Sequence, residues 1–86
     1  MELHMSDANR RERIHELDVT VWVGKHGIES VVEELDDQLS NRDLVKVKFH
    51  RSARGGTDTE TLAADLAERV GSSVVETRGH TAVIEG

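Results

Sequence analysis

The sequence predicts an α+β fold, an α/β sandwich with the element order α-β-α-β-α-β-β, in which a small mixed sheet carries its helices mainly on one face. Two observations indicate this order: segments of alternating apolar residues predict strands, and segments of helical period lie between them. Glycines and polar turn residues separate the segments. A chain of 86 residues supports one hydrophobic core, so we expect a single domain over residues 8–86 and a disordered extension over residues 1–7.

The N-terminal third predicts a helix and a strand. Residues 8–17 place Ile14 and Leu17 three residues apart among charges, which is typical of a short helix with a thin apolar stripe. Residues 18–23 alternate, and Thr20 and Trp22 share one face of the predicted strand. The opposite, buried face is formed by Val19, Val21 and Val23.

A second helix is expected from Ile28 to about Ser40, because its apolar residues recur at helical spacing. These apolar residues are Ile28, Val31, Val32, Leu35 and Leu39. Its outer face is acidic and carries no base between residues 29 and 37. The acids are Glu29, Glu33, Glu34, Asp36 and Asp37.

The second half predicts a strand, a loop, a helix and two further strands. Residues 44–49 alternate strictly, which places Lys46 and Lys48 together on the face opposite Val45, Val47 and Phe49. Residues 52–56 show no periodicity and predict a flexible loop.

The helix that follows this loop is expected to begin with a capping box, in which the Thr57 hydroxyl accepts from the amide of Glu60. It is expected to end at a left-handed Gly71. Strands over residues 73–77 and 81–84, joined by a turn at residues 78–80, complete the chain.

Composition limits the classes of protein to consider. Without cysteine there is no disulfide, thiolate metal site or cysteine nucleophile, so an intracellular, cytoplasmic setting is expected. No apolar run approaches the roughly 20 residues that span a bilayer. The formal net charge of -6 argues at first against nucleic acid, but the acids of residues 29–37 and the bases of residues 42–54 are segregated. The acidic, lysine-poor composition also suits solubility in high salt.

The first candidate site is the sequence Gly24-Lys25-His26-Gly27, a GxxG spacing between a predicted strand and a predicted helix. Taken alone, this spacing is more typical of a structural turn. Its position before a helix N-terminus, with the Lys25 ammonium beside it, also suits phosphate, because glycines let a sugar-phosphate backbone approach the peptide. His26 is equally compatible with donation to a phosphate and with a solvated loop position.

The second candidate is a basic track on the strand over residues 44–49 and its flanks, suited to phosphates. Its residues are Arg42, Lys46, Lys48, Arg51 and Arg54. Arg54-Gly55-Gly56 is either an RGG-type contact for single-stranded RNA or a plain linker. Arg78 and His80 flank Gly79 in the last turn, and a binding role for them depends on where the fold puts them.

Trp22 has two interpretations: packing against the N-terminal helix, which we favour, or exposure as a platform for base stacking. Enzyme chemistry finds little support. The histidines lack a metal-ligand spacing, and there is no GxSxG, Walker loop or DxD pair. We therefore expect no catalysis, no cofactor and no metal.

Three motifs occur in the order of a known family: Val23 to Ile28, Leu44 to Lys48, and Arg78 to Ile84. Together they resemble the CRM (chloroplast RNA splicing and ribosome maturation) domain, and most closely the stand-alone YhbY-type proteins of bacteria and archaea. The family pattern is a "vGkxGl" loop, an "eLiKVkv" strand and a terminal "GhxlvLyr" strand. The resemblance extends over residues 10–84.

The resemblance implies a fold related to the C-terminal domain of translation initiation factor three, with a KH-like GxxG loop that binds RNA. Stand-alone members are associated with precursors of the large ribosomal subunit. Gly24, Lys25 and Gly27 match the family loop, and Lys46 and Lys48 match its basic strand. The chain departs from the pattern in its C-terminal Glu85-Gly86, its shorter N-terminal helix and its acidity.

The leading hypothesis is therefore a monomeric, non-catalytic protein, not associated with membranes, that binds ribosomal RNA in pre-50S assembly, with ribosomal proteins as further partners. The alternative is a protein-interaction module that meets ribosome assembly factors through the acidic helix over residues 28–40. A third hypothesis, a hydrolase using His26 or His80, requires a nearby oriented carboxylate that the sequence does not identify.

Overall fold

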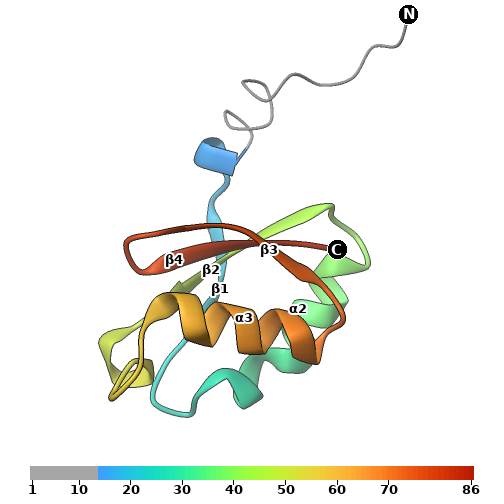
Figure 1. Ribbon diagram of the computed structural model, residues 1–86. Coiled ribbons are helices and arrows are strands. Elements are labelled where there is room, and N and C mark those ends of the chain that lie inside the picture. The colour runs from blue at the N-terminus through green and yellow to red at the C-terminus, as the bar shows by residue number, and fades with distance from the viewer. Residues whose placement is uncertain (1–13) are drawn as a thin grey trace, which may run out of the picture.

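The computed structural model describes residues 14–86 and has the predicted α+β architecture (Figure 1). The strands are β1 (Val19–Val23), β2 (Leu44–Phe49), β3 (Ser73–Arg78) and β4 (Thr81–Glu85). The helices are α2 (Val32–Leu39) and α3 (Thr59–Arg69), with the 3-10 turns η1 (Ile28–Val31) and η2 (Arg51–Ala53). Of the helix expected over residues 8–17, residues 14–16 are helical, while residues 8–13 and the expected extension over residues 1–7 lie outside the described residues.

The four strands form one mixed sheet in the order β1-β2-β4-β3. β1 and β2 run parallel, whereas β4 is antiparallel to both β2 and β3. A parallel pair needs a crossover connection, which η1 and α2 supply. β3 and β4 need only the two-residue turn at Gly79 and His80.

The main core lies between the sheet and the layer formed by α2 and α3, on the lower side of the sheet in Figure 1. Alternate residues of β2 face this layer, because successive side chains in a strand point to opposite faces. Among the largest fully buried side chains are Phe49, Leu35, Leu66 and Ile84. The hydrophobic effect of burying this apolar surface is the main force that holds the helices on the sheet.

A second, smaller cluster covers part of the opposite face, which we call the outer face. Its buried residues are Ile14, Leu44 and Val83, and Leu17 and Val75 pack against them. His15 Nε2 also lies 3.5 Å from Glu76 Oε2 of β3. The N-terminal helical turn therefore covers one end of the outer face, and the expectation of helices mainly on one face is confirmed.

The expected alternation of β1 is wrong at the start of the strand. The register shifts between Val19 and Val21, so Thr20 is an extra residue in the pairing with β2. Its hydroxyl donates to Gln38 Oε1 of α2 at 2.6 Å, on the helix side of the sheet. Beyond the bulge, Val21 and Val23 are buried as expected.

The expected capping box of α3 is also wrong by one residue. Asp58, and not Thr57, is the N-cap, and its Oδ1 accepts from the Thr61 amide at 2.8 Å. A carboxylate at this position gains from the helix dipole as well as from the hydrogen bond. The expected C-terminal stop is confirmed: Gly71 has φ +69°, and the Ser72 amide donates to Ala67 O at 2.8 Å.

Within residues 14–86, no helix combines the length and the apolar character that crossing a membrane requires.

Candidate functional site

Three connections meet at one end of the sheet, which we call the basic end. They are the turn at residues 24–27 after β1, the segment over residues 50–54 after β2, and the β3-β4 turn at residues 79–80. Parallel pairing puts the carboxyl ends of β1 and β2 at the same edge, and antiparallel pairing brings the end of β3 and the start of β4 there. Two backbone hydrogen bonds hold this end together: His50 N donates to Val23 O, and Phe49 N donates to His80 O.

The basic end contains eight of the eleven candidate residues. These are Gly24, Lys25, His26, Gly27, Arg51, Arg54, Arg78 and His80. Six of the eight have a charged or imidazole side chain. Arg54 is half-buried, and the other five of these side chains are exposed. His50, also exposed here, was not among the candidates. Its position one residue after β2, beside a parallel β1, is the signal that would have identified it.

The GKHG sequence forms a compact turn. Gly27 N donates to Gly24 O at 2.9 Å, the i to i+3 bond of a β-turn, which leaves Lys25 and His26 exposed at the tip. Gly27 has φ 80° and ψ -179°, a region that is essentially restricted to glycine. Gly24 has no positive φ, and a Cβ built on it meets nothing within 4 Å. The two glycines therefore differ: Gly27 is required by the backbone, whereas Gly24 leaves open space at the surface.

The helix that follows this turn begins differently from the expectation. The sequence predicts one α-helix from Ile28, but the first four residues form the 3-10 turn η1, and α2 begins at Val32. A single 3-10 turn aligns fewer peptide dipoles than an α-helix, so the dipole contribution to anion binding is smaller than the sequence suggests. Gly27 O is also occupied, since it accepts from the Ser30 hydroxyl at 2.8 Å.

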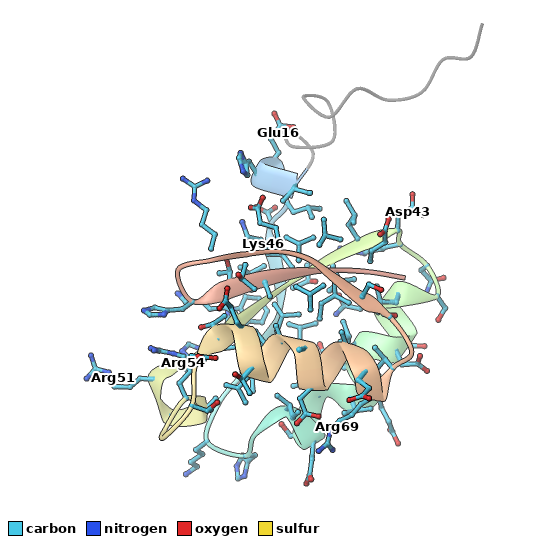
Figure 2. The ribbon with its side chains drawn as sticks, in the orientation of Figure 1. Glu16, Asp43, Lys46, Arg51, Arg54 and Arg69 are labelled. Carbon is cyan, nitrogen blue, oxygen red and sulfur yellow. The ribbon has the colours of Figure 1, made fainter. Side chains whose placement is uncertain are left out.

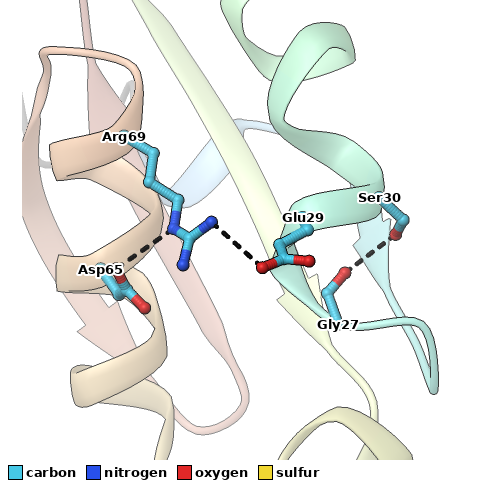
Figure 3. A network of polar contacts seen from close by, with 5 residues as sticks. All are labelled: Gly27, Glu29, Ser30, Asp65 and Arg69. Atoms are coloured by element: carbon cyan, nitrogen blue, oxygen red, sulfur yellow. Dashed lines mark hydrogen bonds and ion pairs between the residues drawn. The ribbon is translucent and has the colours of Figure 1, made fainter.

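An ion-pair network holds η1 against α3 just beyond the turn (Figure 3). Arg69 lies between two carboxylates, with Nη1 3.5 Å from Glu29 Oε2 and Nε 3.3 Å from Asp65 Oδ1. Glu29 thus points towards Arg69 of α3. The first acid after the turn in the sequence, Glu29, is thus paired with Arg69.

The segment after β2 presents two arginines in different ways. Figure 2 shows Arg51 and Arg54 at the end of the molecule opposite Asp43. Arg54 Nε donates to Phe49 O at 3.3 Å, so this guanidinium holds η2 against the end of β2. Arg51 is exposed.

A hollow of about 400 Å³ lies between the β3-β4 turn and the start of α3. Its lining residues are Arg54, Thr57 to Glu60, and Thr77 to His80. The lining residues include the basic Arg54, Arg78 and His80 and the acidic Asp58 and Glu60. Because both signs of charge line it, the hollow is not a simple anion site. Within the described part of the chain, no group of three or more His, Asp or Glu is placed to hold a metal ion.

The structure does not bring Arg42 to the basic end. Arg42 precedes β2, and β2 spans about 17 Å along the strand, so the residue lies at the far edge of the sheet. Lys46 and Lys48 share the outer face as their alternation predicts, Lys46 half-buried in mid-strand and Lys48 exposed near the basic end. Trp22, opposite Lys48 in the register, is 53% exposed. The favoured packing of Trp22 against the N-terminal helix stays a prediction, because residues 8–13 of that helix lie outside the described residues.

The comparisons with known proteins agree with this fold and with the motifs. The family model of the CRS1 / YhbY (CRM) domain matches residues 6–84, which is most of the chain. The chain belongs to the CRM domain family.

One relative is similar over most of this chain. The chain is 41% identical over 70 residues to a protein of Methanocaldococcus jannaschii named "Probable RNA-binding protein MJ0652". That alignment covers 81% of this chain and 52% of the relative, so the chain spans about half the length of the curated relative it matches.

The fold is similar to the solution structure of the hypothetical protein SAV1595 from Staphylococcus aureus, described as "a putative RNA binding protein". The TM-score is 0.70 at 33% sequence identity, over 87% of this chain and 77% of that one. The small mixed α+β fold predicted from the sequence is thereby confirmed.

Proposed function

We propose that the protein is a non-catalytic RNA-binding protein that holds the sugar-phosphate backbone at its basic end. The observation that carries the proposal is the convergence of the GKHG turn, the segment after β2 and the β3-β4 turn at one edge of the sheet. Both relatives described above carry RNA binding in their names. Ribosomal RNA of the large subunit is the target that the family resemblance implies.

Phosphate is the group that this end suits. Lys25 and Arg51 are exposed cations on two of the connections, and Arg78 is an exposed cation at the end of β3, so an RNA strand can contact more than one of them at once. Each contact releases counterions from the RNA, which gives affinity without base specificity. The open space at Gly24 lets the backbone approach the turn closely.

Substitution at Gly24 tests the turn directly. Gly24→Asp places a carboxylate beside Lys25 with no clash and no positive φ to strain the backbone, so we expect RNA retention to fall at least tenfold. Gly24→Ala is the matched control, because it adds the same Cβ without charge. Gly27→Asp is less informative, since any side chain there costs about 1–3 kcal/mol in backbone strain.

The measurement is retention of ribosomal RNA fragments on a filter, with circular dichroism and thermal unfolding of each variant as the folding control. If Gly24→Asp and Gly24→Ala both bind as the wild type does, the turn is not a phosphate site. If the wild type retains no RNA at moderate ionic strength, the proposed function itself is refuted.

Salt titration separates this proposal from the alternative of a protein-interaction module. Phosphate contacts give a linear fall of log K with log salt, and each lost contact lowers the slope by about 0.7 to 0.9. A protein partner bound through the exposed acids of α2, such as Glu33 and Asp37, requires none of the cations of the basic end. If neutralising Lys25 and Arg51 leaves both the binding and the slope of log K against log salt unchanged, the protein partner is favoured.

A further inference from the structure

One row of residues crosses the whole outer face next to the basic end. The registers pair Trp22 with Lys48, Lys48 with Thr81, and Thr81 with Arg78. Paired residues on neighbouring strands point to the same face, so the four side chains lie in one line across β1, β2, β4 and β3. With strands about 4.8 Å apart, Trp22 and Arg78 are separated by about 14 Å.

The composition of this row is unlike that of the rest of the outer face. Trp22, Lys48 and Arg78 are exposed, and Thr81 between them is small, with its hydroxyl donating to Arg78 O at 2.9 Å. The row contains an aromatic ring and two cations, and no acid. The neighbouring row carries Glu76, which His15 contacts at 3.5 Å, and Glu85 lies a further row away, opposite Leu44.

The N-terminal turn explains why this row stays open. Ile14 and Leu17 cover the outer face where it carries Leu44 and Val83, and Trp22 belongs to neither hydrophobic cluster. Trp22 is the one large hydrophobic side chain that is exposed in residues 14–86. An exposed indole on a sheet, flanked by cations, suits an unpaired base, because a ring can stack on the base while the cations meet the adjoining phosphates.

We infer that the Trp22 row binds a single-stranded segment of RNA, with one unpaired base stacked on the indole and the adjoining phosphates held by Lys48 and Arg78. The inference rests on the proposed function and extends it: the GKHG turn holds backbone phosphate, and the row selects unpaired over paired RNA. Because every base has a π-face, the row distinguishes single-stranded from double-stranded RNA and does not distinguish one base from another. Charge complementarity and the single exposed ring together favour RNA over a protein partner at this face.

Intrinsic fluorescence measures this contact directly, because Trp22 is the single tryptophan of the chain. We expect single-stranded oligoadenylate to quench the intrinsic fluorescence, and the duplex of the same strand with oligouridylate to leave it nearly unchanged. Removing the ring by Trp22→Leu is expected to weaken single-strand binding about five- to a hundredfold, measured by anisotropy of a labelled oligoadenylate. Trp22→Phe keeps an aromatic face and is expected to retain most of the affinity.

The salt dependence of RNA binding tests the cations of the row. For a single strand, Lys48→Gln is expected to lower the slope of log K against log salt by about 0.7. Trp22→Leu removes no charge and is expected to leave that slope as in the wild type. Thermal unfolding of each variant checks the fold, and because Trp22 lies outside both clusters its truncation leaves no cavity.

Gly24→Asp, measured in parallel on the same oligonucleotide, separates failure of this inference from failure of the proposed function. If Trp22→Leu binds single strands as the wild type does while Gly24→Asp loses binding, the platform is refuted, the RNA-binding function stands, and the exposed ring is left as a protein contact. Equal quenching by the duplex also refutes the platform. If the wild type binds neither form of RNA, both proposals are refuted.

Discussion

Asp58 shows how one side chain organises the start of α3. Its carboxylate accepts from the Thr61 amide, and this backbone hydrogen bond is the main cause that holds the pKa of Asp58 below the ordinary aspartate value of 3.8. The hydrogen bond favours the charged form, because an amide N–H binds a carboxylate more strongly than a carboxylic acid. Asp58 and His80 both line the hollow between the β3-β4 turn and the start of α3.

The pKa direction predicts how the cap responds to acid. A carboxyl group whose pKa is lower in the folded protein stabilises it above the unfolded pKa, and this contribution is lost as pH falls through the folded value. We expect the melting temperature to drop on acidification below about pH 4 in part because Asp58 is protonated.

Two variants isolate this contribution. Asp58→Asn keeps a capping oxygen and is expected to melt close to the wild type at neutral pH while losing part of the acid sensitivity. Asp58→Ala removes the cap and is expected to melt lower at neutral pH. Thermal unfolding followed by circular dichroism between pH 3 and pH 7 measures both effects. An identical acid dependence in the wild type and Asp58→Asn would exclude the proposed role of this carboxylate.

At the scale of elements, β2 contributes both to the main core and to the outer face of the sheet. It is parallel to β1 and antiparallel to β4, so its carboxyl end lies among the connections of the basic end and its start lies beside Glu85 at the opposite edge. Its alternation separates the core residues Val47 and Phe49 from Lys48 on the outer face. A single strand thus supplies both the core of the domain and a cation for the outer row.

The two flanks of β2 provide a matched pair for testing the location of the interface. Arg42 and Arg51 are both exposed, but only Arg51 lies at the basic end. We expect Arg51→Gln to lower the slope of log K against log salt for RNA by about 0.7 to 0.9, and Arg42→Gln to leave it unchanged. Filter retention over a series of salt concentrations is the measurement. Equal effects of the two substitutions would place RNA along the entire strand instead.

At the scale of the whole molecule, one small core carries the fold. Leu35 of α2 and Leu66 of α3 are fully buried against the sheet, and the second cluster behind it is much smaller. Proteins typically have a free energy of unfolding of about 5–15 kcal/mol, so the loss of one large core side chain is a considerable fraction of it.

Leu35→Ala is therefore expected to lower the free energy of unfolding by about 2–5 kcal/mol, the usual cost of the lost burial and the remaining cavity. Glu33→Ala, on the exposed face of the same helix, is the control and is expected to change it by less than about 0.5 kcal/mol. Urea unfolding measures both. A small effect of Leu35→Ala would mean that α2 does not depend on the main core.

The sequence by itself determined most of the elements and most of their buried faces, because these follow from local periodicity. The alternation of Val45, Val47 and Phe49 predicted β2, and Gly71 predicted the end of α3. Local details with competing solutions were not predictable. Asp58 displaced Thr57 as the cap, and the bulge at Thr20 and the 3-10 start of the helix depend on contacts with α2 and the sheet.

Only the tertiary structure decided which candidate residues meet. Strand order and direction arise from pairing between distant segments, so no local pattern shows that residues 24–27, 50–54 and 79–80 lie at one edge while Arg42 lies at the other. The same holds for Trp22. Its alternation put it on the outer face, but its exposure depends on where Ile14 and Leu17 pack, which is over Leu44 and Val83 in the rows beside the Trp22 row.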